Sequence, residues 1–308
     1  VITSGAGTTA WTATNGDTTF DAVVSPVVSG SVANKAQIAA VTDLNADSAN
    51  VTETVTYTKV GSLVPSSSDG NFPRVPTVVY PNDPSDATKV TPAGVPTVPG
   101  YTAHDPEGHV LTPGSSYQPS DPTKDTTITY TADTQKGSVS YVDDTTGKTL
   151  KTDSISGTTG SKSSYSTSGN IADYKKHGYE LVTDGYPADL TFDNNDTTDQ
   201  NFTVHLKHQL TPVNPTDPQT PGAPINPDEP DGPKWPARTN YDKTVNETVS
   251  YVDQTGHVVA KQHTDSVNFT RTVVVDNVTG EVITSGAGTK AWTATNGDTT
   301  FDAVVSPV

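Results

Sequence analysis

The two ends of the chain carry almost the same 27 residues, and this repetition limits what the chain can fold into. Val1–Val27 reads VITSGAGTTAWTATNGDTTFDAVVSPV, and Val282–Val308 repeats it with Lys290 in place of Thr9. A self-similar stretch of this length indicates tandem repeats. We therefore expect the two ends to be the same internal stretch of two successive repeats.

One domain is then divided between the two ends of the chain. Thr244–Val308 followed by Val28–Val60 spells one complete all-β domain. Trp11 and Trp292 are the largest apolar side chains of this kind of domain, and we expect them in its core. The halves either reunite within one chain, pair between neighbouring chains as a swap, or remain two incomplete halves. The sequence leaves all three arrangements open.

The composition favours small domains joined by extended connectors. Only 31% of the 308 residues are hydrophobic, and the chain contains 24 prolines and 24 glycines, so part of it cannot bury enough apolar surface to offset the entropy of ordering. Cysteine is absent, which excludes disulfides and thiolate chemistry. With a net charge of −17 and scattered basic residues, we expect no nucleic acid partner. No apolar run is long enough to predict membrane insertion.

Proline occupies every third position from Pro212 to Pro236. Because polyproline II has three residues per turn, the spacing predicts a straight rod roughly 75 Å long at about 3.1 Å per residue. A solvated spacer and a PxxP ligand for an aromatic groove both fit this pattern.

A second proline-rich stretch, Pro65–Pro122, lacks that strict period and predicts loops and turns laid on a neighbouring domain. At its end, Ile128 and Tyr130 alternate with threonines, which predicts a strand over Thr126–Thr131.

Two segments begin alike and indicate two related β modules. VSYVDDTTGK starts at Val139 and VSYVDQTGH at Val249, and each sets Val and Tyr on one strand face before a turn closed by glycine. In the second module, a strand that ends at the turn DNVTG carries four apolar residues on one face, Val267, Phe269, Val273 and Val275.

The first module has the element order of a β-grasp fold. Phe202, Val204 and Leu206 alternate with polar residues in a final strand. Before it, NIADYKKHGYEL predicts a short helix with Asn170 as N-cap and Gly178 just beyond its end. A strand pair, a helix and a second strand pair follow one another.

These motifs resemble the mucus-binding protein repeats of lactobacillus-type cell-surface adhesins. The resemblance extends to the connector PINPDEPDGPKWP and to the repeated AWTATNGDTTFDAVVSPV. The resemblance implies a mainly β protein, α+β in part, with a ubiquitin-like β-grasp MucBP domain and an all-β B2-type mucin-binding domain, joined by polyproline II linkers into an elongated rod. The expected parts are the C-terminal part of a B2-type domain at 1–60, a Pro-rich inter-repeat segment ending in a strand at 61–136, the MucBP domain at 137–208, a connector with proline at every third residue at 209–243, and the N-terminal part of the next B2-type domain at 244–308.

The resemblance also implies a function without catalysis. Repeats of this family bind host mucin glycans, some members bind immunoglobulins, and the parent proteins are secreted and anchored to the cell wall through another part of the chain. We expect weak binding multiplied by adjacent repeats of the same polypeptide. A passive stalk, with adhesion located elsewhere in the parent protein, is the alternative.

Candidate ligand-binding residues fall into two groups. A sugar needs an aromatic face with fixed polar groups beside it, which points to Tyr165, Tyr186 and Trp235. The oxygen-rich run DNNDTTDQN suits calcium, with Asp193, Asn195, Asp196 and Asp199 as ligands; we expect no other cofactor.

The histidines are expected to be solvated. HDPEGH, His104–His109, predicts a turn because proline and glycine interrupt it. His205 and His208 flank a strand end and receive the same interpretation.

Overall fold

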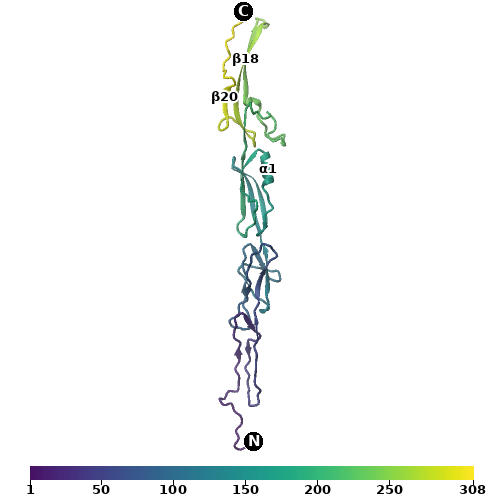
Figure 1. The fold of residues 1–308 in the computed structure, drawn as a ribbon, viewed down its shortest axis with the longest axis vertical. Helices are drawn as coiled ribbons and strands as arrows, with labels where there is room; N and C mark the ends of the chain where they lie inside the picture. The colour runs from purple at the N-terminus through teal and green to yellow at the C-terminus, as the bar shows by residue number, and fades with distance from the viewer. The chain divides into compact units, whose positions relative to one another are not determined.

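The computed structural model describes residues 1–308 and is mostly β, with one short α-helix (Figure 1). No helix is long and apolar enough to cross a membrane. The chain divides into two compact units: unit 1 comprises Val1–Gln135, Ser156–Lys162 and Thr191–Asp199, and unit 2 comprises Lys136–Ile155, Ser163–Leu190 and Gln200–Val308.

The first 60 residues of unit 1 form two small antiparallel sheets, β1 with β3 and β2 with β4. The side chains of Trp11, Val23 and Val24 are 88%, 62% and 69% exposed. The expectation that Trp11 fills a core is therefore wrong here, because no second sheet covers it. The bounds are β1 Val23–Val24, β2 Ser31–Ala33, β3 Gln37–Ile38 and β4 Tyr57–Lys59.

The rest of unit 1 centres on a five-stranded sheet in the order β6-β5-β11-β8-β9. Its core contains Leu63, Tyr80, Ile128 and Tyr130, each at most 1% exposed. The predicted strand is confirmed as β11. Most of Pro65–Pro122 is loop and turn, as predicted, but the stretch also supplies short strands and the buried Tyr80 to this sheet and its core instead of lying on a neighbouring domain. The bounds are β5 Ser62–Ser66, β6 Val78–Val79, β7 Ala93–Gly94, β8 Tyr101–His104, β9 Val110–Leu111, β10 Ser116–Tyr117 and β11 Thr126–Ala132.

The next sheet has the strand order β13-β12-β15-β14, with β12 parallel to β15. Val204 and Leu206 on β15 are fully buried, and Val204 lies opposite the equally buried Tyr141 on β12, so the predicted alternation is confirmed. Two antiparallel pairs joined through parallel central strands give the β-grasp topology. The bounds are β12 Thr134–Asp143, β13 Lys148–Thr158, β14 Tyr179–Asp184 and β15 Gln200–His208.

The helix α1, Ser168–Lys176, lies beside this sheet (Figure 1). Ile171 is buried, and the Tyr174 ring packs against Tyr141 and Tyr179. The predicted N-cap is wrong, because Thr167 occupies that position. Asn170 lies within the helix, where its side-chain NH₂ group donates a hydrogen bond to the Asp153 carboxylate. Gly178 does follow the helix end with φ +93°, as predicted.

The last part of unit 2 is built on the long strand β18. The side chains of Val273 and Val275 on β18 are fully buried. Trp292, expected in the core, is half-buried beneath two cations, with Arg271 Cζ 4.6 Å and Lys243 Nζ 5.4 Å from its ring centre. The bounds are β16 Leu210–Val213, β17 Asp242–Val252, β18 Val258–Asp276, β19 Val282–Ile283 and β20 Lys290–Ala294, with a 3-10 turn at Arg238–Asn240.

The two halves of the divided domain lie in different units. The strands within residues 1–60 pair with one another, and β17 to β20 pair with one another and with β16.

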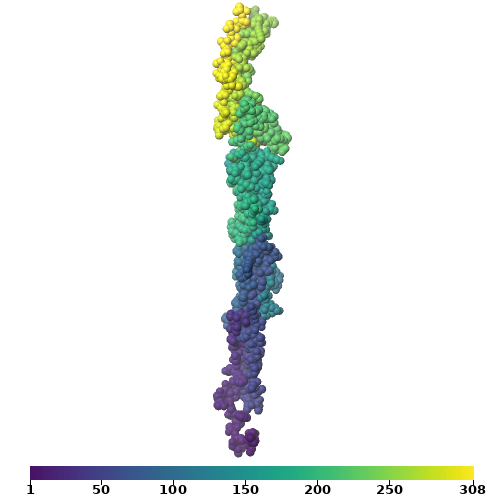
Figure 2. Space-filling model, viewed as in Figure 1, coloured from purple at the N-terminus to yellow at the C-terminus, as the bar shows by residue number.

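The proline-rich connector folds back as a hairpin loop, so the predicted straight rod over Pro212–Pro236 is wrong. The Trp235 amide donates to the Ala223 carbonyl at 2.9 Å, and the Ile225 amide donates to the Pro233 carbonyl at 2.8 Å. Ile225 and Trp235 then pack against the core formed by Val213, Tyr241, Val273 and Val275. Apolar burial outweighs the local proline preference, and the green connector lies against the rest of its unit (Figure 2).

The backbone of Gly178 approaches the β18–β19 turn closely. A Cβ at this position would collide with the Asn277 carbonyl. The Gln209 amide donates to the Gly178 carbonyl, and the Asn277 amide donates to the Gln209 carbonyl, both at 2.9 Å. Glycine is therefore needed here for both its positive φ and its lack of a side chain.

Gly178→Ala should destabilise the protein by about 2–4 kcal/mol, because the backbone strain of a positive φ adds to the collision of the new Cβ with the Asn277 carbonyl. Gly147→Ala is the matched control, since Gly147 has φ +75° but a Cβ added there would meet no atom within 4 Å; it should cost about 1 kcal/mol. Thermal unfolding of both variants measures the difference. An equal loss of stability in the two variants would contradict the close approach of Gly178 to Asn277.

Candidate functional site

Tyr165 and Tyr186 lie together in the β-grasp domain. Their ring centres are 5.3 Å apart in an edge-to-face arrangement. Tyr186 is 8% exposed and donates its hydroxyl to Ser163, so its ring supports the core and offers no open platform to a sugar. This part of the sugar-binding prediction is wrong, because the apolar ring is buried by Tyr165 and Phe202.

The half-buried Tyr165 is held by its hydroxyl, which lies 2.6 Å from the Tyr141 hydroxyl and 2.7 Å from the Asp153 carboxylate. Burial and the hydrogen bonds to Tyr141 and Asp153 raise the pKa of Tyr165 above its usual range. Trp235 packs on the core beneath the connector, at a different place in unit 2. Sugar binding by Tyr165 and Trp235 stays a prediction.

The oxygen-rich run predicted to bind calcium forms a turn in unit 1. Asp193 accepts from the Asn195 amide, and Asn195 accepts from the amide and hydroxyl of Thr197. The Asp196 carboxylate accepts from the Gln135 side chain at 2.6 Å, and Asp199 is exposed. These oxygens hold the turn, and calcium binding by them stays a prediction.

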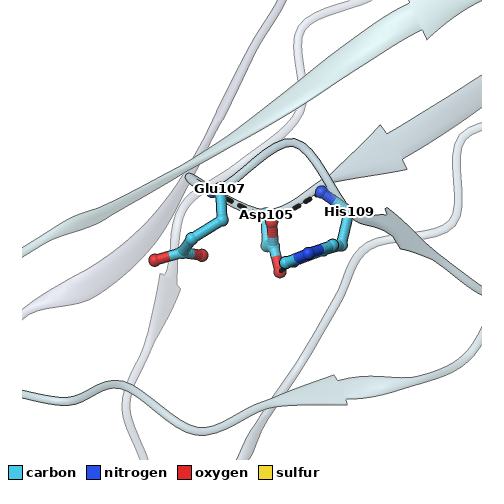
Figure 3. A group of neighbouring side chains, drawn as sticks. All are labelled: Asp105, Glu107 and His109. Carbon is cyan, nitrogen blue, oxygen red and sulfur yellow. Dashed lines mark hydrogen bonds and ion pairs between the residues drawn. The ribbon is translucent and has the colours of Figure 1, made fainter.

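Asp105, Glu107 and His109 place three possible metal-ligating atoms within 4.8 Å of one another. Figure 3 shows the Asp105 carboxylate and the His109 ring pointing toward one another, and their atoms are 3.1 Å apart. Asp105 also accepts from the backbone amides of Glu107 and His109. The predicted turn is confirmed, and its carboxylate is already used to close it.

His208 contradicts the expectation of a solvated histidine. Its Nε2 lies 2.7 Å from Asp143 Oδ2, and its Nδ1 lies 2.6 Å from Asp276 Oδ2. The side chains of His208, Asp143 and Asp276 are only 5%, 2% and 9% exposed. The edge of the Tyr179 ring packs against the imidazole, with 5.3 Å between ring centres. A buried ionic cluster therefore joins the ends of β12, β15 and β18.

The cluster requires a charged imidazole. An ionised carboxylate only accepts hydrogen bonds, so when both aspartates are ionised both ring nitrogens donate and His208 is an imidazolium. Burial opposes this charge, but the hydrogen bonds to Asp276 and Asp143 outweigh it and raise the pKa of His208. Burial also disfavours the charged Asp143 carboxylate, yet hydrogen bonds from Thr146, His208 and Thr145 lower its pKa.

Each aspartate of this cluster also holds a turn. Asp143 begins DDTTG and accepts from the Thr145 amide, while Asp276 begins DNVTG and accepts from the Val278 amide. Both turns are visible in the sequence, but nothing local pairs one with the other. The usable signal was His208 itself, which continues the inward alternation of Val204 and Leu206.

Two family models match the parts that meet at this cluster. A mucin binding domain matches residues 135–208, and a Muc B2-like domain matches residues 1–61 and 236–308. The chain belongs to the mucus-binding protein repeats. Its MucBP domain supplies Asp143 and His208, and its Muc B2-like part supplies Asp276.

Solved structures of similar sequence include a type 2 repeat of the mucus binding protein MUB from Lactobacillus reuteri. It is 36% identical, with 51% of this chain and 74% of that chain covered, at a TM-score of 0.35. Mub-RV is 33% identical, with 56% and 82% covered, at a TM-score of 0.41. No match was found among curated proteins. Such mucus-binding repeats are adhesion domains of extracellular surface proteins.

His208→Gln should destabilise the chain by about 3–5 kcal/mol, because two buried carboxylates lose their only cation. His205→Gln is the matched control: His205 sits on the same strand and pairs with Asp144 at 2.8 Å, but both side chains are about 40% exposed. That variant should cost less than about 1 kcal/mol. Denaturant unfolding at pH 5.5 compares them, and similar losses would contradict the buried cluster.

The stabilisation by His208 should depend on pH. Its raised pKa contributes stability that is complete below the ordinary histidine pKa of 6.5 and is lost as pH rises through the folded value. The lowered pKa of Asp143 contributes above 3.8 and is lost as pH falls through its folded value. The stability difference between wild type and His208→Gln should therefore be largest between about pH 3.8 and 6.5, where Asp143 is ionised and His208 is protonated. A difference that grows steadily from pH 6 to 9 would contradict this.

Proposed function

We propose that this chain is a repeat of a cell-surface adhesin that binds host mucin glycoproteins through their glycans. The observation that carries this is the presence of both a mucin binding domain and a Muc B2-like domain in one chain. The parent protein is extracellular and held at the bacterial cell wall through another part of its sequence.

Each repeat binds weakly, and adjacent repeats multiply the effect. Tethering converts each later contact into an intramolecular event, which raises the overall affinity by orders of magnitude when the spacing allows simultaneous contact. A repeated protein facing repeated glycans on mucin satisfies this condition.

Two other functions are supported by particular observations. A passive stalk is favoured by the buried His208 cluster, which would stiffen a spacer. Immunoglobulin binding is favoured by β13, an edge strand of eleven residues whose side chains are mostly exposed, because an edge strand can pair with a strand of a partner. Proline at an exposed β13 position would abolish only the immunoglobulin contact.

Mucin retention by arrays of one, two and four repeats distinguishes adhesin from stalk. The proposal expects retention to rise much more steeply than in proportion to repeat number. The control replaces some repeats by inert spacers of equal length. Retention that depends on length alone would show a stalk.

Mucin binding should strengthen as pH falls toward the isoelectric point of about 4.5. At neutral pH the net charge of −17 opposes contact with sialylated or sulfated mucin, and protonation of carboxylates removes this repulsion. Added salt should also strengthen binding at pH 7 through screening. Surface plasmon resonance on immobilised mucin measures both trends, and binding that weakens with salt at pH 7 would contradict this account.

A further inference from the structure

A cleft of about 310 Å³ opens beside α1 in unit 2. Three parts of the unit line it: the end of α1 and the start of β14, the hairpin of the connector, and the β18–β19 turn. The cleft therefore forms only where the MucBP domain, the connector and the Muc B2-like part come together. Its volume lies at the lower end of the range typical of small-ligand sites.

Aromatic rings and free polar groups converge on this cleft. Tyr174 and Tyr179 are half-buried and packed edge to face, with ring centres 5.5 Å apart. The Asn226 side-chain oxygen accepts from the Asp228 amide, and the Asn277 side-chain oxygen accepts from the Thr211 hydroxyl. This leaves the amide NH₂ groups of Asn226 and Asn277 without protein acceptors. Rings beside unpartnered donors are the arrangement that recognises a pyranose.

The charge of the lining selects among sugars. His177 Nε2 lies 2.5 Å from Glu229 Oε1, and His177 Nδ1 lies 2.7 Å from the Asp173 carbonyl. The Asp173 and Glu229 carboxylates outnumber the single imidazole, so the lining is acidic when both are ionised. Carboxylates accept hydrogen bonds from sugar hydroxyls and repel an anionic sugar.

We infer that this cleft is a subsite for a neutral pyranose bearing an acetamido group. The ring stacks against the tyrosine pair, its hydroxyls donate to the carboxylates, and the amides of Asn226 and Asn277 donate to the acetamido carbonyl and ring oxygens. The inference rests on the proposed mucin binding and names the residues that would contact the glycan.

The test titrates the full chain with the methyl α-glycoside of N-acetylgalactosamine and follows amide signals by NMR. The side-chain amides of Asn226 and Asn277 should shift together, whereas the methyl glycoside of sialic acid should leave them unchanged. Mucin retention by tandem arrays is measured in parallel.

Asn226→Asp is the decisive variant, because it keeps the oxygen that accepts from the Asp228 amide. It should weaken glycoside binding by roughly tenfold, through one lost hydrogen bond and one added carboxylate. Asn296→Asp is the matched control, since the Asn296 oxygen accepts from the Asp298 amide in the same kind of turn but lies outside the cleft lining. Both variants should unfold at the wild-type temperature.

The outcomes separate the subsite from the proposed function. Wild-type mucin retention with no glycoside shift at the cleft, or with unchanged binding by Asn226→Asp, overturns the subsite and leaves mucin binding standing. Cleft signals that shift with the glycoside in a protein that never retains mucin support the subsite and overturn mucin binding.

Discussion

A buried imidazolium between two carboxylates fixes how the MucBP domain continues into the Muc B2-like part. His208 ends β15, Asp143 ends β12 and Asp276 ends β18, so the cluster ties three strand ends together. Such a cluster tolerates little movement, because separating its members leaves a buried charge without its partner. The close backbone approach of Gly178 to Asn277 adds a steric limit at the same junction.

The junction also shapes the surface available to ligands. Tyr179 packs against His208 on one side and against Tyr174 on the other. The ionic cluster and the tyrosine pair of the cleft are thus in direct contact. The proposed weak binding would benefit from a preorganised site, because little conformational entropy would be lost when a ligand arrives. A stiff junction therefore serves an adhesin as well as a stalk.

The sequence predicted the β-grasp domain well because its signals are local. Val204 and Leu206 alternate along one strand, and Gly178 marks a helix end, so neither depends on distant residues. The ionic cluster was missed because the partners of His208 lie 65 and 68 residues away. The prediction of a straight connector was wrong for a related reason. Proline spacing indicates only the local backbone preference, whereas the hairpin depends on Ile225 and Trp235 packing against a core formed by distant residues. Tyr186 is likewise buried by residues distant in the sequence, and its position in a loop motif did not indicate this.

Residual dipolar couplings at pH 5.5 test the central claim most directly, because they report whether two parts of a chain share one orientation. In the wild type, residues 164–190 and 200–208 of the MucBP domain should fit the same alignment tensor as β16 to β19. In His208→Gln the two sets should require different tensors while each set remains internally well fitted. One shared tensor in both proteins, or two tensors in the wild type, would contradict the claim that His208 holds this junction.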